Sequence, residues 1–208
     1  MRVVRPLLPV SLRLPLLVAV LLAGCARPAD PAPPAGAEAP ADERPPAQAP
    51  EADGPTVLTA EGWGPLRIGM ALPDVVAAAG EDADPEAVGG ADPALCDEFR
   101  PSRAPEGMLV MIEGGRLTRV SLLSGSDVKT EEGFGVGDAA SAIRAAYGTE
   151  AVVTPHKYVP APAAYITVWR TDPEAADARG IVYEVGADAR VSHVHAGGPS
   201  IQYVEGCL

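Results

Sequence analysis

The chain has few basic residues, few aromatic residues and only three cysteines. Lysine and arginine number 16 against 28 aspartates and glutamates, so the 208 residues carry a formal net charge of −12 at pH 7. Binding to nucleic acid or to an anionic membrane surface needs clustered positive charge, and we therefore expect neither as a partner. The sequence also lacks a nucleophile elbow and a base at a diagnostic spacing from a serine or cysteine, which argues against an enzyme.

An apolar stretch near the N-terminus is too short to span a bilayer. It covers Leu14–Gly24 and follows an arginine, whereas a spanning helix needs about 20 apolar residues. With Arg2 and Arg5 upstream, residues 1–24 have the basic and apolar regions of an export signal. The stretch ends in Leu22-Ala23-Gly24-Cys25, which resembles the lipobox of bacterial lipoproteins.

This resemblance implies a protein of the cell envelope that is held by lipid. In such lipoproteins the signal peptide, here residues 1–24, is removed and the cysteine, here Cys25, carries acyl chains such as palmitate; two or more chains anchor a protein stably. Ala26 follows the cysteine where aspartate would direct retention, which in a Gram-negative host implies the periplasmic face of the outer membrane. A plain secretory signal with a chance cysteine and an uncleaved membrane helix are the alternatives.

Residues 25–55 predict a disordered tether between the lipid and a folded domain. Of the 30 residues from Ala26 to Pro55, nine are proline and ten are alanine, a composition that favours extended, partly polyproline structure. We expect one folded domain over residues 56–208.

The predicted domain opens with an internal repeat. Residues 64–80 align with residues 132–148 at a constant offset of 68, and each copy has an extended apolar segment followed by a short helix that ends at Gly80 or Gly148. Apolar residues recur at i, i+3, i+4 and i+7 in both helices, which predicts one apolar face on each.

Strand-like segments follow each predicted helix, and Gly114-Gly115 between two of them predicts a hairpin turn. Neither repeat is long enough to bury much core alone, so pairing both in one sheet is expected. The predicted class is therefore α+β: two tandem units, about 56–125 and 126–208, each with a helix and three antiparallel strands, share one sheet with the helices on one face. The expected strands are 96–100, 108–113, 116–123, 165–170, 180–185 and 190–195.

The pattern of Ile68, Gly69 and Met70 followed by Val75 and Gly80 resembles the small-lipoprotein family that includes the accessory subunit of the outer-membrane β-barrel assembly machine. The tandem arrangement resembles the β-lactamase inhibitor protein family. These resemblances imply the α+β fold and a role in binding proteins of the envelope. No functional residue is carried over, because the matched positions are structural.

The two cysteines outside the lipobox, Cys96 and Cys207, are expected to form a disulfide. Disulfides persist in the envelope, and these are the only two thiols left once Cys25 is lipidated. Two buried free thiols are the alternative.

The three histidines of the chain are weighed as metal ligands. His193 and His195 alternate on a predicted strand, so both side chains leave the same face, and with His156 they offer three nitrogens to a metal ion. Nothing in the sequence brings His156 near the pair, and surface histidines on a strand are the preferred interpretation. We predict no metal, no cofactor and no catalytic residue.

The aromatic residues, 4 % of the chain, are concentrated late. Tyr165, Thr167 and Trp169 alternate with apolar residues on a predicted strand, so one set packs under the helices and the other lies on the open face of the sheet. We expect a non-catalytic binding domain that recognises an envelope protein through Tyr165, Trp169 and Tyr183. A lectin-like carbohydrate-binding module is the alternative, a metal binder the third possibility, and rings packed in the core would remove the proposed face.

Overall fold

The structure is a computed structural model, and it describes residues 56–86 and 89–207. The predicted signal peptide, Cys25 and the tether lie outside the described residues, so the lipid anchor stays a prediction. Within the described part of the chain, no helix has both the length and the apolar composition needed to cross a bilayer.

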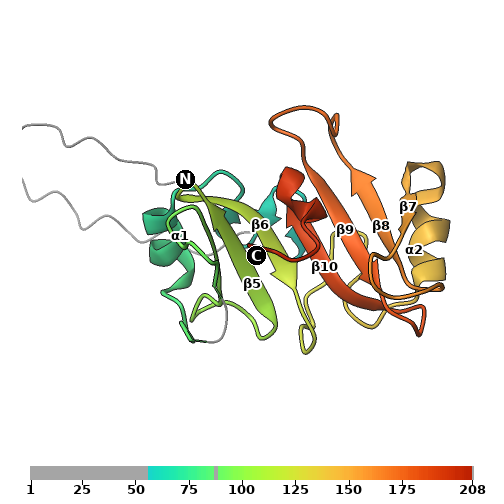
Figure 1. Cartoon of the computed structure of the whole chain (residues 1–208), viewed down its shortest axis with the longest axis horizontal. Helices are drawn as coiled ribbons and strands as arrows, with labels where there is room; N and C mark the ends of the chain where they lie inside the picture. The colour runs from blue at the N-terminus through green and yellow to red at the C-terminus, as the bar shows by residue number, and fades with distance from the viewer. Residues whose placement is uncertain (1–55, 87–88, 208) are drawn as a thin grey trace, which may run out of the picture. The chain divides into compact units, whose positions relative to one another are not determined.

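A seven-stranded antiparallel sheet is the centre of the described domain (Figure 1). Its strands are β4 (Cys96–Phe99), β5 (Met108–Glu113), β6 (Arg116–Leu122), β7 (Val152–Pro155), β8 (Ala164–Trp169), β9 (Gly180–Val185) and β10 (Val191–Gly197). The order β4-β5-β6-β10-β9-β8-β7 places β6 beside β10, so the two halves of the chain meet in the middle of the sheet. Gly114 and Gly115, both with positive φ, form the predicted turn between β5 and β6.

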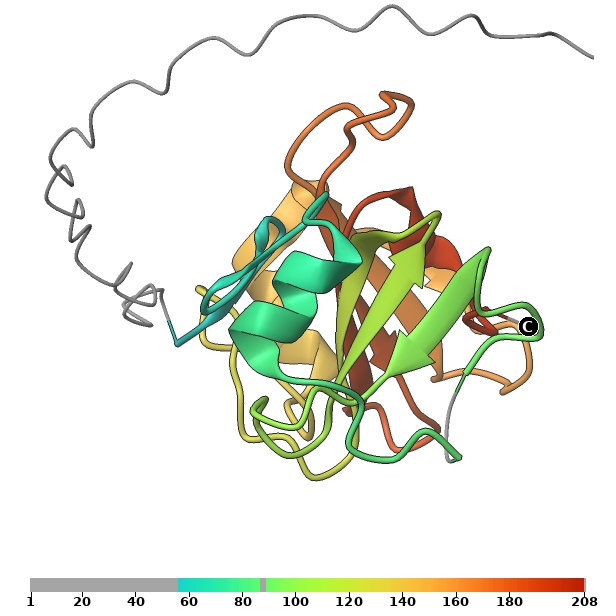
Figure 2. The same cartoon turned by 90° about the vertical axis from the view of Figure 1, so that its left-hand side faces the viewer.

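Two short helices and a small sheet cover one face of the large sheet (Figure 2). Helices α1 (Leu72–Ala79) and α2 (Ala140–Tyr147) each end at a glycine with positive φ, which supplies the conformation that terminates a helix. Val75 of α1 and Ile143 of α2 are fully buried in one apolar core with the strands. The small sheet consists of β1 (Leu58–Thr59), β2 (Gly62–Trp63) and β3 (Leu66–Arg67).

The predicted fold class is wrong. The domain is mostly β, with two separate sheets and only two α-helices, of eight residues each, among the described residues. The second half of the chain adds a fourth strand to the large sheet, because Val152–Pro155 pairs with β8 at an edge, where exposed side chains and a terminal proline are tolerated. Residues 58–67 fold as a sheet of their own. Two tandem units of one helix and three strands sharing one sheet are therefore not what the chain forms.

Alternation along the strands gives the large sheet an apolar face and a polar face. In β9, Ile181, Tyr183 and Val185 belong to the core under the helices and are at most 1 % exposed. Val182 and Glu184 point to the opposite face, since successive side chains of a strand point to opposite sides. Because both helices lie on the apolar face, the polar face is left for other contacts.

Residues 198–207, here called the C-terminal strap, lie across this polar face. The strap includes a 3₁₀ helix, η2 (Pro199–Gln202). Arg119 of β6 donates from Nη1 to the carbonyl oxygens of Ser200 at 3.1 Å and Tyr203 at 3.0 Å. A disulfide joins Cys207 at the end of the strap to Cys96 at the start of β4, with a Cα separation of 5.4 Å. The strap is thus fixed at its middle by hydrogen bonds and at its end by a covalent bond.

Candidate functional site

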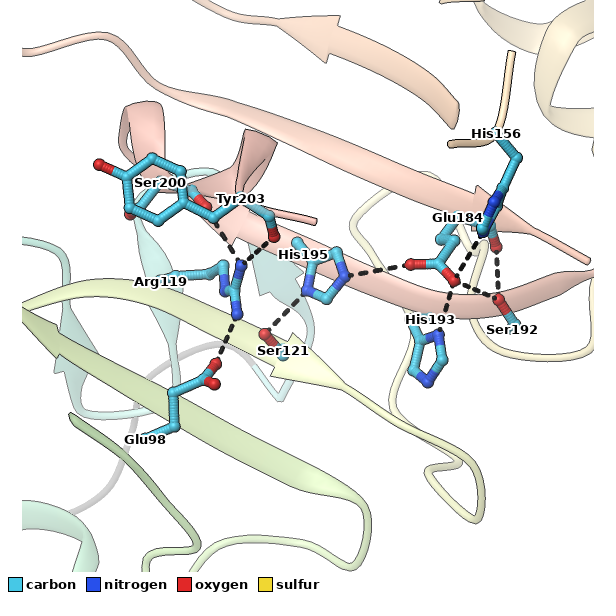
Figure 3. A network of polar contacts seen from close by, with 10 residues as sticks. All are labelled: Glu98, Arg119, Ser121, His156, Glu184, Ser192, His193, His195, Ser200 and Tyr203. Atoms are coloured by element: carbon cyan, nitrogen blue, oxygen red, sulfur yellow. Dashed lines mark hydrogen bonds and ion pairs between the residues drawn. The ribbon is translucent and has the colours of Figure 1, made fainter. Parts of the chain in front are cut away.

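Glu184, on the polar face of β9, is the centre of a cluster that includes every histidine of the chain (Figure 3). Its Oε1 lies 3.3 Å from His156 Nε2 and 3.3 Å from His193 Nδ1, and its Oε2 lies 3.8 Å from His195 Nε2. Sheet register creates the cluster: His193 lies opposite Glu184 across the β9–β10 pair, and His156 follows the last residue of β7. The strands therefore unite residues that are far apart in the sequence.

The hydrogen bonds of His156 and His195 differ from each other. Nδ1 of His156 accepts from the backbone N–H groups of Tyr158 and Val159, at 3.1 and 3.2 Å. Its Nε2 therefore carries the proton and donates to Glu184. Nδ1 of His195 lies 2.9 Å from Ser121 Oγ, within hydrogen-bond distance. Both rings are thus held in place from the side that faces away from the carboxylate.

The environment keeps Glu184 ionised and His195 neutral. The imidazoles of His193 and His195 hold the pKa of Glu184 far below its usual range. Burial lowers the pKa of His195 to about 4, because the charged imidazolium loses its hydration there. At neutral pH the cluster therefore contains a carboxylate beside an uncharged His195.

The arrangement does not suit a metal ion. Among the described residues, no group of three histidine, cysteine, aspartate or glutamate side chains is placed to hold one. Nε2 of His156 bears a proton and so has no lone pair for a metal. The three histidines meet, but they meet on a carboxylate that occupies the space between them.

Ser121, His195 and Glu184 lie in the order of a nucleophile, a base and an acid, and four features oppose that chemistry. Ser121 is only 1 % exposed. The 3.8 Å between His195 and Glu184 is longer than a hydrogen bond, and an imidazole with a pKa of about 4 is a weak base at neutral pH. The serine also lies within a strand whose backbone N–H groups serve the sheet, so they are not aimed as an oxyanion hole.

A cavity of about 280 Å³ opens on the polar face beside the C-terminal strap. Glu184, His195 and Tyr165 lie on its sheet side, and Tyr203 lies on the side of the strap. The ring of Tyr165 stacks on that of His156 at 4.8 Å between centroids, and His156 lies 6.4 Å from the ring of Tyr158. An aromatic row thus runs from the cavity to the surface.

Comparison with protein-family models, with curated proteins and with solved structures finds no match for this chain. The function must therefore be inferred from the geometry of the site itself.

The structure separates the residues predicted for the binding face. Tyr165 and Trp169 lie on the polar face, half-buried, and a Cβ on Gly180 would lie only 2.7 Å from Cε3 of Trp169, so the indole covers that glycine. Tyr183 is a correction: it is fully buried on the apolar face, where its hydroxyl bonds to Tyr147 and Thr130. It belongs to the core and cannot contact a partner.

The sequence analysis did not identify Glu184, the carboxylate that all three histidines surround. A signal for it existed. Ile181, Tyr183 and Val185 alternate along the strand as one apolar face, so Glu184, which lies between two of them, must point to the other face. The same alternation would have placed Tyr183 in the core.

Proposed function

We propose that the chain is a lipid-anchored envelope protein whose domain binds a protein partner on the polar face of its large sheet. The anchor is Cys25, and in a Gram-negative host the site is the periplasmic face of the outer membrane. The lipobox-like motif supports this location, and a disulfide between Cys96 and Cys207 suits an oxidising compartment. The domain acts by binding and not by catalysis.

The observation that carries the proposal is the set of exposed apolar side chains around the cavity. Tyr203 and Val204 line the cavity and are 47 % and 38 % exposed, and Tyr158, which follows the lining residue Lys157, is 60 % exposed. Exposed apolar groups around a concave site are typical of interaction surfaces, and tyrosine is enriched at the energetic centres of protein interfaces. A partner that covers these side chains would bury them together with the mouth of the cavity.

A carbohydrate-binding module is the second candidate, because the same tyrosines offer rings for sugar stacking. Stacking needs a free ring face, and one face of Tyr165, the ring next to Glu184 in the sheet, is covered by His156. At the rim, Nζ of Lys157 lies over the ring of Tyr158, 5.1 Å from its centroid. Few ring faces are therefore free for a sugar, which favours a broad protein surface as the ligand.

Photo-crosslinking in intact cells tests the proposal. A photoreactive amino acid replaces Tyr158 or Tyr203 in the full-length chain, and Glu174, which is exposed and outside the cavity lining, serves as the control position. We expect both rim positions to capture the same envelope protein and the control position to capture none of it. A glycan array probed with the full-length chain, with Tyr203→Ala beside it, tests the carbohydrate alternative. If neither rim position captures a protein, or if a sugar binds in a Tyr203-dependent way, the protein-binding proposal is wrong.

The anchor has its own test. Cys25→Ala is expected to move the protein from the membrane fraction and the detergent phase to the soluble fraction. Unchanged fractionation would show that lipid on Cys25 does not hold the chain.

A further inference from the structure

The floor of the cavity carries negative charge. Glu184 places an ionised carboxylate at its floor, within a chain of net charge −12. Lys157 is the cationic side chain among the lining residues, but its Nζ lies 3.2 Å from Oε1 of Glu205, and the side chain is 55 % exposed at the rim. The lysine therefore neutralises Glu205 and leaves the floor negative.

The three imidazoles around Glu184 do not place a cation at its Oε2. His156 is neutral, because its Nδ1 accepts two backbone N–H groups and so carries no proton. Burial keeps the pKa of His195 at about 4, which leaves this ring uncharged at neutral pH. The third ring, His193, has its Nδ1 3.3 Å from Oε1, the same oxygen that His156 contacts. Of the three rings, the uncharged one of His195 is the one that faces Oε2, at 3.8 Å.

Two oxygen atoms at the cavity have unused hydrogen-bonding capacity. Oε2 of Glu184 has His195 Nε2 at 3.8 Å, beyond hydrogen-bond range, and the Glu184 side chain keeps 19 % exposure. The hydroxyl of Tyr165 is buried and has no hydrogen bond to a side chain among the described residues, although the backbone N–H of Lys157 interacts with its oxygen. A group with several donors would satisfy both, and an ammonium offers three N–H donors while a guanidinium offers five.

The aromatic lining fits the same chemistry. Tyr165 and Tyr203 both line the cavity, and ring faces attract cations through their quadrupole. A carboxylate flanked by tyrosine rings is a favourable site for a cation at the end of an aliphatic stem, whose methylene groups contact the rings.

We infer that the cavity receives the ammonium or guanidinium group of a lysine or arginine side chain of the partner protein, with Glu184 as its counter-ion. This inference rests on the proposed function. The cavity, at about 280 Å³, is smaller than the usual pocket for a drug-sized ligand and suits the end of one side chain. The exposed apolar rim and the negative charge of the chain both favour a basic protein surface as the source of that side chain.

Butylamine serves as the probe for the cation, and 1-butanol is its neutral match. Each is titrated into the full-length chain in detergent micelles while the ring signals of Tyr165 and His195 are followed by NMR. We expect a saturable shift with butylamine and none with butanol. Glu184→Gln should weaken the amine response by about tenfold or more, because the charge-assisted contact is lost. Glu174→Gln, which removes one exposed carboxylate elsewhere, should leave the response unchanged.

A second pair of variants keeps Glu184 and its three histidines intact, in case Glu184→Gln fails to fold. Thr167 lines the cavity on the same face of β8 as Tyr165, diagonal to Glu184 across the β8–β9 pair. The ammonium of Thr167→Lys can reach the carboxylate, whereas Thr167→Met has a similar length without charge. We expect the lysine variant to melt about 2 °C or more above the methionine variant. Equal melting, or a lower value for lysine, contradicts the inference.

The outcomes separate this inference from the proposed function. If the rim positions capture a protein in cells but butylamine and butanol act alike, the partner binds without a cation in the cavity and the inference is wrong. If the amine shifts require Glu184, and Glu184→Gln weakens crosslinking to the captured partner while Glu174→Gln does not, the inference stands. If nothing is captured, the proposed function fails on its own test.

Discussion

Arg119 and Glu98 form an ion pair that is almost completely buried on the polar face of the sheet. Arg119 Nη2 lies 2.5 Å from Glu98 Oε1, and the two side chains are 4 % and 11 % exposed. The same guanidinium bonds to the carbonyl oxygens of Ser200 and Tyr203 in the strap. One arginine therefore links strand β4 to the C-terminal strap through the middle of the sheet.

Arg119→Met is expected to destabilise the domain by about 3–5 kcal/mol, because it leaves the charge of Glu98 buried without a partner. Urea unfolding followed by circular dichroism measures the loss. The double variant Glu98→Leu/Arg119→Met removes both charges and should recover much of it. A single variant as stable as the parent would show that the pair does not constrain the fold.

The disulfide between Cys96 and Cys207 closes a loop whose ends are 111 residues apart in sequence. Constraining the unfolded chain over such a loop is worth about 4–5 kcal/mol in the chain-entropy model. Cys96→Ser/Cys207→Ser should lower the free energy of unfolding by that amount, and dithiothreitol should have the same effect on the parent protein. Titration of two free thiols in unfolded protein purified under oxidising conditions would contradict the bond.

The helices and the hairpin turn were easier to predict from the sequence than the arrangement of the sheets. Helices near residues 72–79 and 140–147 and the turn at Gly114-Gly115 follow from apolar periodicity and glycine, which are local signals. The strands β1, β2 and β3 have two residues each, too few for any alternation to show. Strand β7 is exposed along its whole length and contains a proline, so only its pairing with β8 identifies it.

The candidate site was predictable only in part, for a similar reason. Alternation placed Tyr165 and Trp169 on the same face as each other, as the structure has them. The meeting of His156 with His193 and His195 depends on the order β10-β9-β8-β7, which no local pattern specifies. The arginine that fixes the strap was also invisible, since Arg119 looks like any charged residue on a strand.

Acid is expected to destabilise the domain through His195. The pKa of His195 is about 4 in the folded chain and about 6.5 in the unfolded chain, so between these values the unfolded chain binds a proton that the folded chain does not. The free energy of unfolding should therefore fall as the pH drops from about 6.5 to 4, by about 3 kcal/mol.

Glu184 contributes to the pH dependence with the same sign, since its depressed pKa gives stability that is complete above the unfolded value and is lost as the pH falls. Urea unfolding at a series of pH values measures the slope, and the neighbouring charges to be considered are Arg119, His156 and His193. His195→Gln should flatten the slope above pH 4.5. A slope that is the same in the variant would assign the effect to other groups.

Tyr183 is expected to matter for stability and not for binding. Its hydroxyl bonds to Thr130 Oγ1 at 3.1 Å and to the hydroxyl of Tyr147 at 3.0 Å, on the face that carries the helices. Tyr183→Phe should cost about 1–2 kcal/mol, because those buried groups lose a partner. Crosslinking from the rim positions should not change. Lost crosslinking in a stably folded Tyr183→Phe protein would instead place this tyrosine in the recognition surface.

The position of the Trp169 indole should depend on the absence of a side chain at Gly180. A Cβ there would lie 2.7 Å from Cε3 of Trp169 and 2.9 Å from the carbonyl oxygen of Val168, closer than real contacts permit, so Gly180→Ala must displace the indole. We expect a cost of about 1–3 kcal/mol and a red shift of tryptophan fluorescence, measured in a Trp63→Phe background that leaves Trp169 as the only reporter. Gly198→Ala is the matched control: Gly198 is buried with φ of −79°, and the nearest atom to an added Cβ is 3.6 Å away. If Gly180→Ala leaves the fluorescence unchanged while Gly198→Ala behaves as expected, the indole does not lie on Gly180 and is free to rotate toward a partner.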